Sequence, residues 1–597
     1  MHYYLLSALS IVFFIFGSVS FSSELPEMEE ILITSGRAER TLDATAAETT
    51  VITGDDIAKM HISTIPELLN TISGINLAER GTPGSQADIS IRGSSFEGVL
   101  VLINGIRAHD PQTGHFAMDI PVNLSTVEKV EVMAGGGSSI YGASASGGVI
   151  NIVTKNASNE VRGTTGFGTF GSRKADISFS RGKSEKNFFL GLHGGRSDGY
   201  MPGTDLDNMG INAGGSFSSK ALMVRWNGGY MNKRFGAANF YAPYQSFEKT
   251  ATFQGGINAG YMMSDKRMVR FRIGSRGHGD DFILIRNRPE FYRNTHYNRS
   301  YSLAAEYLAN PHEMLSITAG VESERMGITS PGLGNHSDYN HAMYGQLTSR
   351  IKKSLISFSM RFDTNSRKES IVSPGIGITV PFDDNKRFRF RTEKSFRSPT
   401  YTELYYNSPS NYGNPSLKSQ HSLSMEAGFD IIKNKSIFGL TGFARRSTNI
   451  IDWVRYPEGI TWFAANHGRL LTAGIEMKYN ISIWQSWNIR INSSLLRQNV
   501  SNTKGSESKY ILNPVERSVV AVFSGPVFAG FKGTFFTRYE KLQLGRSRSP
   551  VAVRISRQFN DMKMKLSFSN LFNEKYEELP GLKAPGRWLN LEVEYCI

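Results

Sequence analysis

The end of the chain, residues 589–597, alternates strictly between apolar and polar side chains. The apolar set is Leu589, Leu591, Val593, Tyr595 and Ile597, and the polar set is Asn590, Glu592, Glu594 and Cys596. A two-residue period is that of a β-strand, and one apolar face with one polar face suits a strand between lipid and a polar lumen. The pattern predicts a transmembrane β-barrel that closes on its last strand, with Leu591, Val593 and Tyr595 facing lipid.

The segment before it repeats this alternation. Residues 551–556 and 562–569 alternate around the turn pair Asn560 and Asp561, which predicts a tight hairpin. Alone, such a hairpin favours a half-buried sheet of a soluble protein. However, short alternating runs separated by Gly, Asn, Asp and Ser continue from about Glu160 to the end. At roughly twenty residues for a strand and its connection, they allow about 22 antiparallel strands.

The N-terminus carries an apolar run, residues 5–16, that is too short to span a bilayer and is followed by small residues. This predicts a secretory signal peptide over residues 1–22, with cleavage between Ser20 and Glu24. Beyond it no long uninterrupted apolar segment occurs, and the mean hydropathy is −0.29. A helical membrane protein is therefore disfavoured, whereas a β-barrel needs apolar side chains only at alternate positions.

Charge and cysteine content exclude other classes. Cys596 is the single cysteine, so disulfides cannot staple the loops of this exported chain. The net charge is +14, but Lys and Arg are scattered without a basic block, so we expect contact with anionic outer-membrane lipid and no nucleic acid. The chain has no H-E-x-x-H motif and no G-x-S-x-G elbow at a turn from a strand to a helix, so we predict that it is not an enzyme.

Residues 49–156 differ from the rest and predict a small α/β domain. A helix is expected from about Thr64, with apolar residues on one face and Gly74 as its stop. Strands are expected at residues 49–53, 88–92, 99–104, 127–133 and 148–154. A barrel of the predicted width would leave an open lumen, which this domain could fill as a plug.

Several motifs in this order resemble TonB-dependent outer-membrane receptors. Plug-like motifs are ISIRG at 89–93, VLVLINGIR at 99–107 and the segment 127–155; barrel-like motifs are FRSPTYTELYY at 396–406, GNPSLK at 413–418, ANHGRLLTAGIE at 465–476 and NLFNEKY at 570–576. The resemblance implies a monomer in the outer membrane of a Gram-negative bacterium. It divides the chain into a signal peptide (1–22), a periplasmic leader (23–48), a plug (49–156) and a barrel (157–597).

Such receptors bind a scarce nutrient and import it with energy relayed by the periplasmic domain of TonB. The partner contact, the TonB box, matches a segment in the leader: Glu30, Ile31, Leu32, Ile33, Thr34 and Ser35. An extended segment of this kind can add a strand to the edge of a partner's sheet. A passive porin would share the barrel but would not need a plug or an extended leader. The resemblance implies no required cofactor.

The resemblance also implies an electrostatic anchor between plug and barrel. The family places two plug arginines opposite two barrel glutamates, and the matching positions are Arg92, Glu426 and Glu476. Ala134 replaces the second arginine. Because a buried carboxylate without a cation is costly, either one glutamate is protonated or solvated, or another basic group takes the vacant place.

Ligand contacts in the family come from outward plug loops and extracellular barrel loops, here residues 81–88, 109–118, 235–247 and 281–297. The candidate residues are Gln86, Asp88, Gln112, His115, Phe240, Tyr241, Tyr244 and Tyr292. Their aromatic rings can stack on a flat ligand, but aromatic rings also form interfacial girdles or pack a loop on itself. Asp205 and Asp207 resemble the calcium-binding loop of some cobalamin receptors, and a plain acidic turn is the alternative.

Three classes of cargo compete. The compact chain most resembles receptors for cobalamin, which favours cobalamin or a related corrinoid. A ferric siderophore is the alternative. Haem is disfavoured, because FRSP and NPSL resemble the boxes of haem receptors but no histidine lies between Phe396 and Leu417 to bind iron; His109 and His115 are the histidines of the plug loop.

Overall fold

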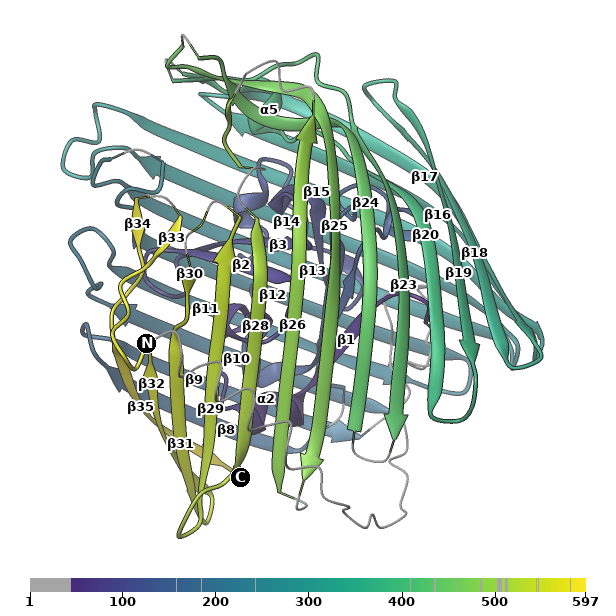
Figure 1. Ribbon diagram of the computed structural model, residues 1–597, viewed down its shortest axis with the longest axis horizontal. Coiled ribbons are helices and arrows are strands. Elements are labelled where there is room, and N and C mark those ends of the chain that lie inside the picture. The colour runs from purple at the N-terminus through teal and green to yellow at the C-terminus, as the bar shows by residue number, and fades with distance from the viewer. Residues whose placement is uncertain are drawn as a thin grey trace.

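The computed structural model describes residues 45–597, apart from 157, 184, 242, 409, 434–435, 458, 484–485, 502–506, 511–513, 544, 546 and 580. Most of these residues form a β-barrel around a smaller N-terminal domain (Figure 1). No helix in the described residues is long and apolar enough to cross a membrane. The predicted signal peptide (1–22) and TonB box (30–35) lie outside the described residues.

A five-stranded sheet with the order β1-β6-β7-β4-β5 organises the plug. Its strands are β1 (Thr49–Thr53), β4 (Val99–Ile103), β5 (Ile106–Arg107), β6 (Val127–Ala134) and β7 (Gly148–Thr154). The other plug elements are β2 (Ile75–Arg80), β3 (Gln86–Ile91), α2 (Gly54–Met60), α3 (Ile65–Leu69), η2 (Phe96–Gly98), η3 (Gly114–Phe116), η4 (Leu124–Thr126) and α4 (Ser138–Tyr141). Buried aliphatic residues of β4, β6, β7 and α3 form a continuous core between the sheet and the helices.

The predicted plug strands are confirmed with small changes at their ends, whereas the helical part differs. Helix α3 begins after Thr64, whose side chain accepts a hydrogen bond from the Glu67 N–H, but the helix ends at Leu69 rather than near Gly74. The cause is a tightened last turn, because the N–H of Thr71 bonds to the carbonyl of Leu68, three residues back. Helix α2 was not predicted.

The barrel confirms the predicted number of strands. Among the described residues, 22 long strands close it by antiparallel pairing of neighbours, and β35 pairs with β8 to complete the ring. These strands are β8 (Glu160–Gly168), β9 (Arg173–Lys183), β10 (Lys186–Ser197), β11 (Leu206–Ser218), β12 (Leu222–Gly236), β13 (Phe247–Ser264), β14 (Arg267–Ile283), β15 (Arg293–His312), β16 (Leu315–Ser330), β17 (Gly334–Ile351), β18 (Ser354–Asn365), β19 (Ser370–Pro381), β20 (Lys386–Arg397), β23 (Gln420–Lys433), β24 (Ser436–Arg455), β25 (Trp462–Ile483), β26 (Trp487–Ser501), β28 (Val515–Pro526), β29 (Phe531–Leu542), β31 (Val551–Phe559), β32 (Met562–Ser569) and β35 (Trp588–Cys596).

Shorter elements decorate the connections between the long strands. They are α5 (Tyr401–Tyr405), β21 (Asn407–Ser408), β22 (Asn411–Tyr412), β27 (Glu507–Ser508), β30 (Ser547–Arg548), β33 (Glu577–Leu579) and β34 (Leu582–Lys583). Helix α5 lies at one end of the barrel, at the top in Figure 1, and the short turn between β31 and β32 lies at the other end. Short turns are typical of the periplasmic end of bacterial barrels.

The last strand turns apolar side chains outward and polar side chains inward, as its alternation predicts. Leu591 and Tyr595 are 42% and 49% exposed on the outer surface, where lipid would cover them. Between them Glu592 points inward and is buried, and its carboxylate accepts a hydrogen bond from the hydroxyl of Ser63 in the plug at 3.1 Å. The hairpin of β31 and β32 is also confirmed, with Asn560 in the left-handed backbone region that its turn requires (φ 50°).

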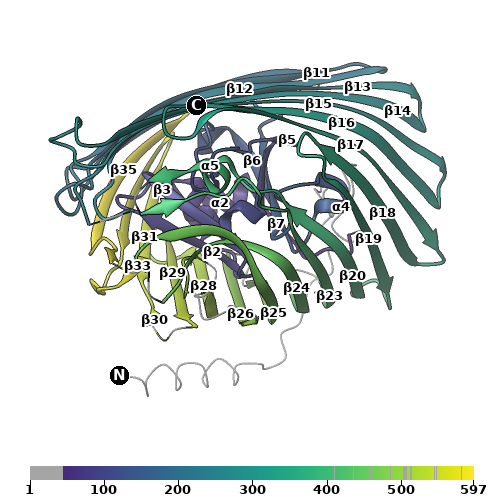
Figure 2. The same ribbon diagram turned by 90° about the horizontal axis from the view of Figure 1, so that it is seen from above.

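The plug lies inside the lumen. Seen from above, the barrel strands surround the plug elements on all sides (Figure 2). The packing is uneven, because a cavity of about 460 Å³ separates α3 and β2 from the barrel strands near the seam, where its lining includes Glu79, Lys174, Arg538 and Trp588. On the opposite side, α4 packs against β17, β18, β19 and β20. The plug therefore leaves a cavity beside the seam, although Ser63 and Glu67 still contact the barrel strands there.

Candidate functional site

Two outward plug loops, residues 81–88 and 109–118, are joined by a buried ion cluster. The carboxylate of Asp88 accepts hydrogen bonds from Arg80 Nη2 at 2.6 Å and from His115 Nδ1 at 2.7 Å. Burial raises the pKa of Asp88, but the charge of Arg80 and the hydrogen bonds from Arg80 and His115 outweigh it and lower the pKa to about 2. Asp88 is therefore a charged tie between the two loops.

The second loop is fixed to the barrel through Gln112. Its Nε2 donates to Asp280 of β14 at 3.2 Å, and its Oε1 accepts from Asn298 of β15 at 2.6 Å. The backbone N–H groups of Tyr401 and Thr402, at the start of α5, donate to the carbonyls of Pro111 and Gln112. The FRSPTYTELYY motif thus supplies a short helix that binds the plug loop.

Helix α5 has strong local support. Thr400 and Glu403 form a capping box, in which each side chain accepts from the other residue's backbone N–H. Arg397 donates to both oxygens of Glu403, at 2.9 and 2.8 Å, and is 1% exposed. This forked ion pair sets the orientation of α5 above the plug.

The barrel loop between β12 and β13 covers the first plug loop. Phe240 is buried against Gly81, and its carbonyl accepts from Arg80 Nη1 at 2.9 Å. Tyr241 follows, and its hydroxyl accepts from Gln86 Nε2 at 3.0 Å. The ring of Tyr241 lies edge-on to His115 with 6.0 Å between centroids. This contact brings aromatic groups of the plug and the barrel together.

The eight predicted ligand residues fall into three groups by exposure. Five are less than 10% exposed and hold the loops together: Gln86, Asp88, Gln112, His115 and Phe240. In contrast, Tyr241 and Tyr244 are 39% and 42% exposed. Tyr292 is half-buried, and its hydroxyl lies 3.3 Å from that of Tyr406. The exposed tyrosines are the members best placed to meet a ligand, and the buried group forms the floor beneath them.

Sequence reasoning missed two aromatic members of this floor. Phe96 stacks on His115 with 4.4 Å between ring centroids, and Tyr510 packs edge-on to Phe96 at 5.3 Å. Lys509 lies 5.4 Å from the centroid of the Tyr510 ring. Phe96 follows the ISIRG motif closely, which is the one signal in the sequence that could have suggested it. We call Phe96, His115, Tyr241 and Tyr510 the aromatic cluster.

The predicted calcium residues are not arranged as a closed site. Both oxygens of Asp205 accept from the guanidinium of Arg286, at 2.5 and 2.9 Å, whereas Asp207 is exposed on β11. In the part of the chain that the structure describes, no group of three or more His, Cys, Asp or Glu side chains is placed to hold a metal ion. Calcium binding stays a prediction, and it would require Asp205 to exchange Arg286 for the cation.

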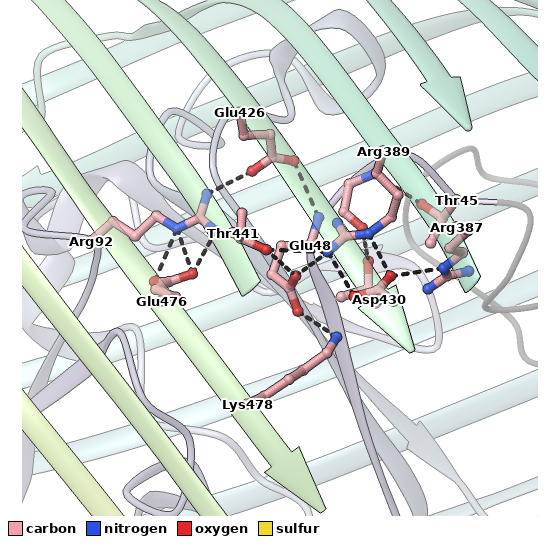
Figure 3. Close-up of polar contacts among 12 residues, drawn as sticks. Thr45, Glu48, Arg92, Arg387, Arg389, Glu426, Asp430, Thr441, Glu476 and Lys478 are labelled. Carbon is pink, nitrogen blue, oxygen red and sulfur yellow. Dashed lines mark hydrogen bonds and ion pairs between the residues drawn. The ribbon is translucent and has the colours of Figure 1, made fainter. Parts of the chain in front are cut away.

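The predicted anchor residues lie together deeper in the lumen (Figure 3). Arg92 is 2% exposed and donates to Glu426 at 2.7 Å and to both oxygens of Glu476, the shortest contact being 2.6 Å. Its backbone adopts the left-handed region (φ 51°), which costs a side-chain-bearing residue about 1 kcal/mol or more. A strained residue that carries a forked pair of ion bonds is typical of a functional contact. We call Arg92, Glu426 and Glu476 the Arg92 anchor.

The fold and these contacts define a wide outer-membrane barrel whose lumen is closed by a domain tied to its inner face. Family models identify it further: residues 41–149 match the TonB-dependent receptor plug domain, and residues 137–541 match the TonB-dependent receptor-like β-barrel. The chain belongs to the TonB-dependent receptors, a family of transporters and receptors in the outer membrane of Gram-negative bacteria.

Relatives and solved structures extend this assignment. The vitamin B12 transporter BtuB of Vibrio cholerae is 25% identical over 460 residues, which cover 72% of each chain, and BtuB of Vibrio vulnificus is 23% identical over 482 residues, 76% of each chain. Among solved structures, the siderophore receptor PirA of Pseudomonas aeruginosa has a TM-score of 0.73 at 17% identity, covering 92% of this chain and 99% of its own. The ferric enterobactin receptor PfeA of the same species has a TM-score of 0.77 at 14% identity, covering 93% and 100%. These structural matches concern the fold alone.

Proposed function

We propose that this receptor imports a small nutrient across the outer membrane, and that TonB supplies the energy by binding residues 30–35. The observation that carries the proposal is the plug inside the lumen, held by the Arg92 anchor. A tethered plug that fills a barrel blocks free diffusion, so transport needs an input of work. A passive porin would gain nothing from such a plug.

For the cargo, we propose cobalamin or a related corrinoid. The sequence relatives named above are vitamin B12 transporters, and their similarity extends over most of the chain. Tyr241, the exposed member of the aromatic cluster, and Tyr244 of the same loop offer ring faces and edges suited to a large flat macrocycle. The proposed role is binding and transport, with no covalent reaction of the cargo.

A ferric siderophore is the second candidate because two cationic side chains lie beside the aromatic cluster. Arg80 lies 5.5 Å from the centroid of the Tyr241 ring, and Lys509 lies beside Tyr510. Cations among aromatic rings suit an anionic iron chelate. Haem fits less well, because His115 is 9% exposed and its Nδ1 is already bonded to Asp88.

Uptake by whole cells tests both the dependence of transport on TonB and the identity of the cargo. Cells that lack other receptors for these nutrients would express this protein with or without TonB, and would be given radiolabelled cobalamin or a ferric catecholate siderophore. We expect accumulation of cobalamin that requires TonB. Uptake that persists without TonB would contradict active transport. If only the iron chelate is taken up, and its uptake requires TonB, the cargo is a ferric siderophore and not a corrinoid.

A further inference from the structure

A second set of charged contacts joins the plug to the barrel at the point where the leader enters. Glu48, the residue just before β1, is 8% exposed. Its carboxylate accepts from Arg389 Nη2 of β20 at 2.5 Å, from Lys478 Nζ of β25 at 2.7 Å and from the Thr441 hydroxyl of β24 at 2.8 Å. Three neighbouring regions of the barrel therefore hold one plug side chain. We call these four residues the Glu48 lock.

The barrel side of the lock is built in advance. Arg389 also donates to Asp430 at 2.7 Å, and Arg387 donates to the same carboxylate at 2.7 Å (Figure 3). Asp430 thus fixes the guanidinium of Arg389 in the position from which it reaches Glu48. Burial raises the pKa of Glu48, but Lys478 and Arg389 outweigh it and hold the pKa well below its usual range, so the carboxylate is charged at neutral pH.

The Glu48 lock is linked to the Arg92 anchor through Glu426. The backbone N–H of Glu48 donates to Glu426 Oε1 at 3.1 Å, while Arg92 donates to Oε2 of the same carboxylate at 2.7 Å. The carbonyl of Glu48 accepts from the N–H of Ala134 at 3.0 Å. Glu48 therefore lies beside the position where the family resemblance implies a second plug arginine.

The arrangement replaces the missing arginine by contacts of opposite polarity. Glu426 receives a backbone N–H in place of a second cation, and the plug contributes an anion that two barrel cations bind. We infer that the Glu48 lock is a second plug-barrel closure of reversed charge, and that it is the first charged plug-barrel contact to break when the leader is pulled. This inference rests on the proposed function, in which TonB pulls from the periplasm.

The position of Glu48 in the chain explains why it would break first. A pull on the leader reaches Glu48 before β1, and it reaches Arg92 only after β1, α2, α3, β2 and β3. Among the described strands, β1 lies at the edge of the plug sheet and pairs with β6 alone, from Thr49 with Met133 to Thr53 with Lys129. Once Glu48 is released, β1 is loaded at one end and can peel from β6 pair by pair. Release also removes one donor from Glu426 and so weakens the Arg92 anchor.

Force spectroscopy on the purified full-length receptor in lipid bilayers tests the lock without TonB. Cys596 is the single cysteine, so a Cys596→Ser background allows one handle to be attached through a new cysteine in the leader. Glu48→Gln is expected to shorten the lifetime of the first step under constant force by about tenfold or more, as loss of a buried charge contact lowers the barrier. Lys478→Met, which changes only the barrel, is expected to act in the same direction.

Two comparisons make the outcome specific. In the double variant Glu48→Gln and Lys478→Met, the lifetime of the first step should shorten by less than the product of the two single effects, because the two residues act on one contact. Glu67→Gln is the matched control, since Glu67 of α3 pairs with Arg554 of β31 near the seam, away from the leader. Its first step should have the lifetime of the parent protein.

Each result decides between the lock and its alternatives. An unchanged first step in both Glu48→Gln and Lys478→Met would overturn the inference, and an equal shortening in Glu67→Gln would show general loosening of the plug instead. Failure of the proposed function would look different, because the first step would still depend on Glu48 while nutrient uptake by cells would not depend on TonB.

Discussion

The hydroxyl of Tyr241 accepts a hydrogen bond from the side-chain amide of Gln86, with 3.0 Å between the two atoms. Tyr241 belongs to a barrel loop and Gln86 begins plug strand β3. A ligand that touches the exposed ring of Tyr241 therefore touches a group that is bonded to the plug. In the proposed function, recognition of the cargo and seating of the plug share this residue.

Replacing Tyr241 separates these two roles. Tyr241→Ala should weaken cargo binding up to about tenfold, because an aromatic contact is worth roughly 0.5 to 1.5 kcal/mol beyond its buried area. Tyr241→Phe keeps the ring and should retain most of the affinity while losing the bond to Gln86. Equilibrium binding of labelled cobalamin to isolated outer membranes measures both. Tyr301→Ala, at an exposed outer-surface position of β15, is the control, and unaltered binding by Tyr241→Ala would remove this residue from the ligand site.

Loss of Arg92 should loosen the plug more than loss of one glutamate. Arg92→Ala leaves Glu426 and Glu476 facing each other without their shared cation, and breaking a buried pair in this way costs about 3 to 5 kcal/mol. Glu426→Gln removes one charge and relieves repulsion between the carboxylates. Entry of large antibiotics through the barrel reports plug seating, and Ala134→Arg should offset part of the leak. Equal leakage in Arg92→Ala and Glu426→Gln would refute the anchor.

The TonB box prediction concerns the leader. Ile31→Pro or Leu32→Pro should abolish uptake but leave cargo binding intact, because proline removes a backbone donor from the segment that we propose pairs with TonB. Uptake and surface binding are measured on the same cells. Ile31→Val is the control that keeps the backbone donor, and normal uptake by the proline variants would place the TonB contact elsewhere.

A charge on the lipid face of the last strand should destabilise the barrel. Val593→Arg should cost roughly 2 to 4 kcal/mol if the residue lies near the bilayer midplane, since its neighbours on the same face, Leu591 and Tyr595, are both exposed outward. Val593→Leu keeps the face apolar and serves as the control. Denaturant unfolding in lipid vesicles measures the difference, and an unchanged free energy of unfolding would argue against contact with lipid at this position.

The plug should lose local stability on acidification through His61. Its ring nitrogens contact the hydroxyls of Thr534 at 3.0 Å and Ser556 at 2.6 Å. Burial, followed by the charges of Lys563 and Lys565, lowers the pKa of His61 to about 3. Because the folded pKa is below the unfolded value, the contribution is complete above about pH 6.5 and is lost as the pH falls toward 3.

At pH 4.5 the expected loss from His61 is roughly 2 to 3 kcal/mol. Hydrogen exchange of the α2 amides, corrected for the intrinsic effect of pH, measures it. His61→Gln retains groups for both hydrogen bonds but does not titrate in this range, so α2 should lose less stability between pH 6.5 and 4.5 in this variant. The same loss in both proteins would assign the effect to other groups.

Much of the fold could be predicted because the membrane imposes a simple pattern on the sequence. Lipid selects apolar side chains at every second position of a strand, which is why Leu591 and Tyr595 indicated the outer face and Asn560 indicated the last hairpin. Helix α2 was missed because its signal, the capping box of Thr53 and Asp56, follows directly on a strand and has few apolar residues. The end of α3 at Leu69 was also missed. Its cause is local, because the last turn tightens through the hydrogen bond from the Thr71 N–H to the Leu68 carbonyl.

The candidate site was less predictable, because its contacts join residues that are far apart in the chain. The loops that contain Gln86 and Tyr241 were predicted, but nothing in either segment indicates that they bond to each other. Glu48 carries no motif, and its role depends on Arg389 and Lys478, which the barrel brings together. The Arg92 anchor was predicted from the family resemblance. The contacts around Ala134 differ from the family pattern, and they become visible only in the folded chain, where Glu48 meets Ala134 and Glu426.

Closure of the barrel by β35 and β8 also constrains how the protein is assembled. Strand β8 follows the plug directly in the chain, yet its partner at the seam is the last strand. Until β35 pairs, β8 and β32 each present an open edge of unpaired backbone groups, which is a hazard in lipid. Because the finished ring surrounds the folded plug, the plug is either enclosed while the seam forms or enters later through an open end of the barrel, and a ring that closes without its plug is an empty pore.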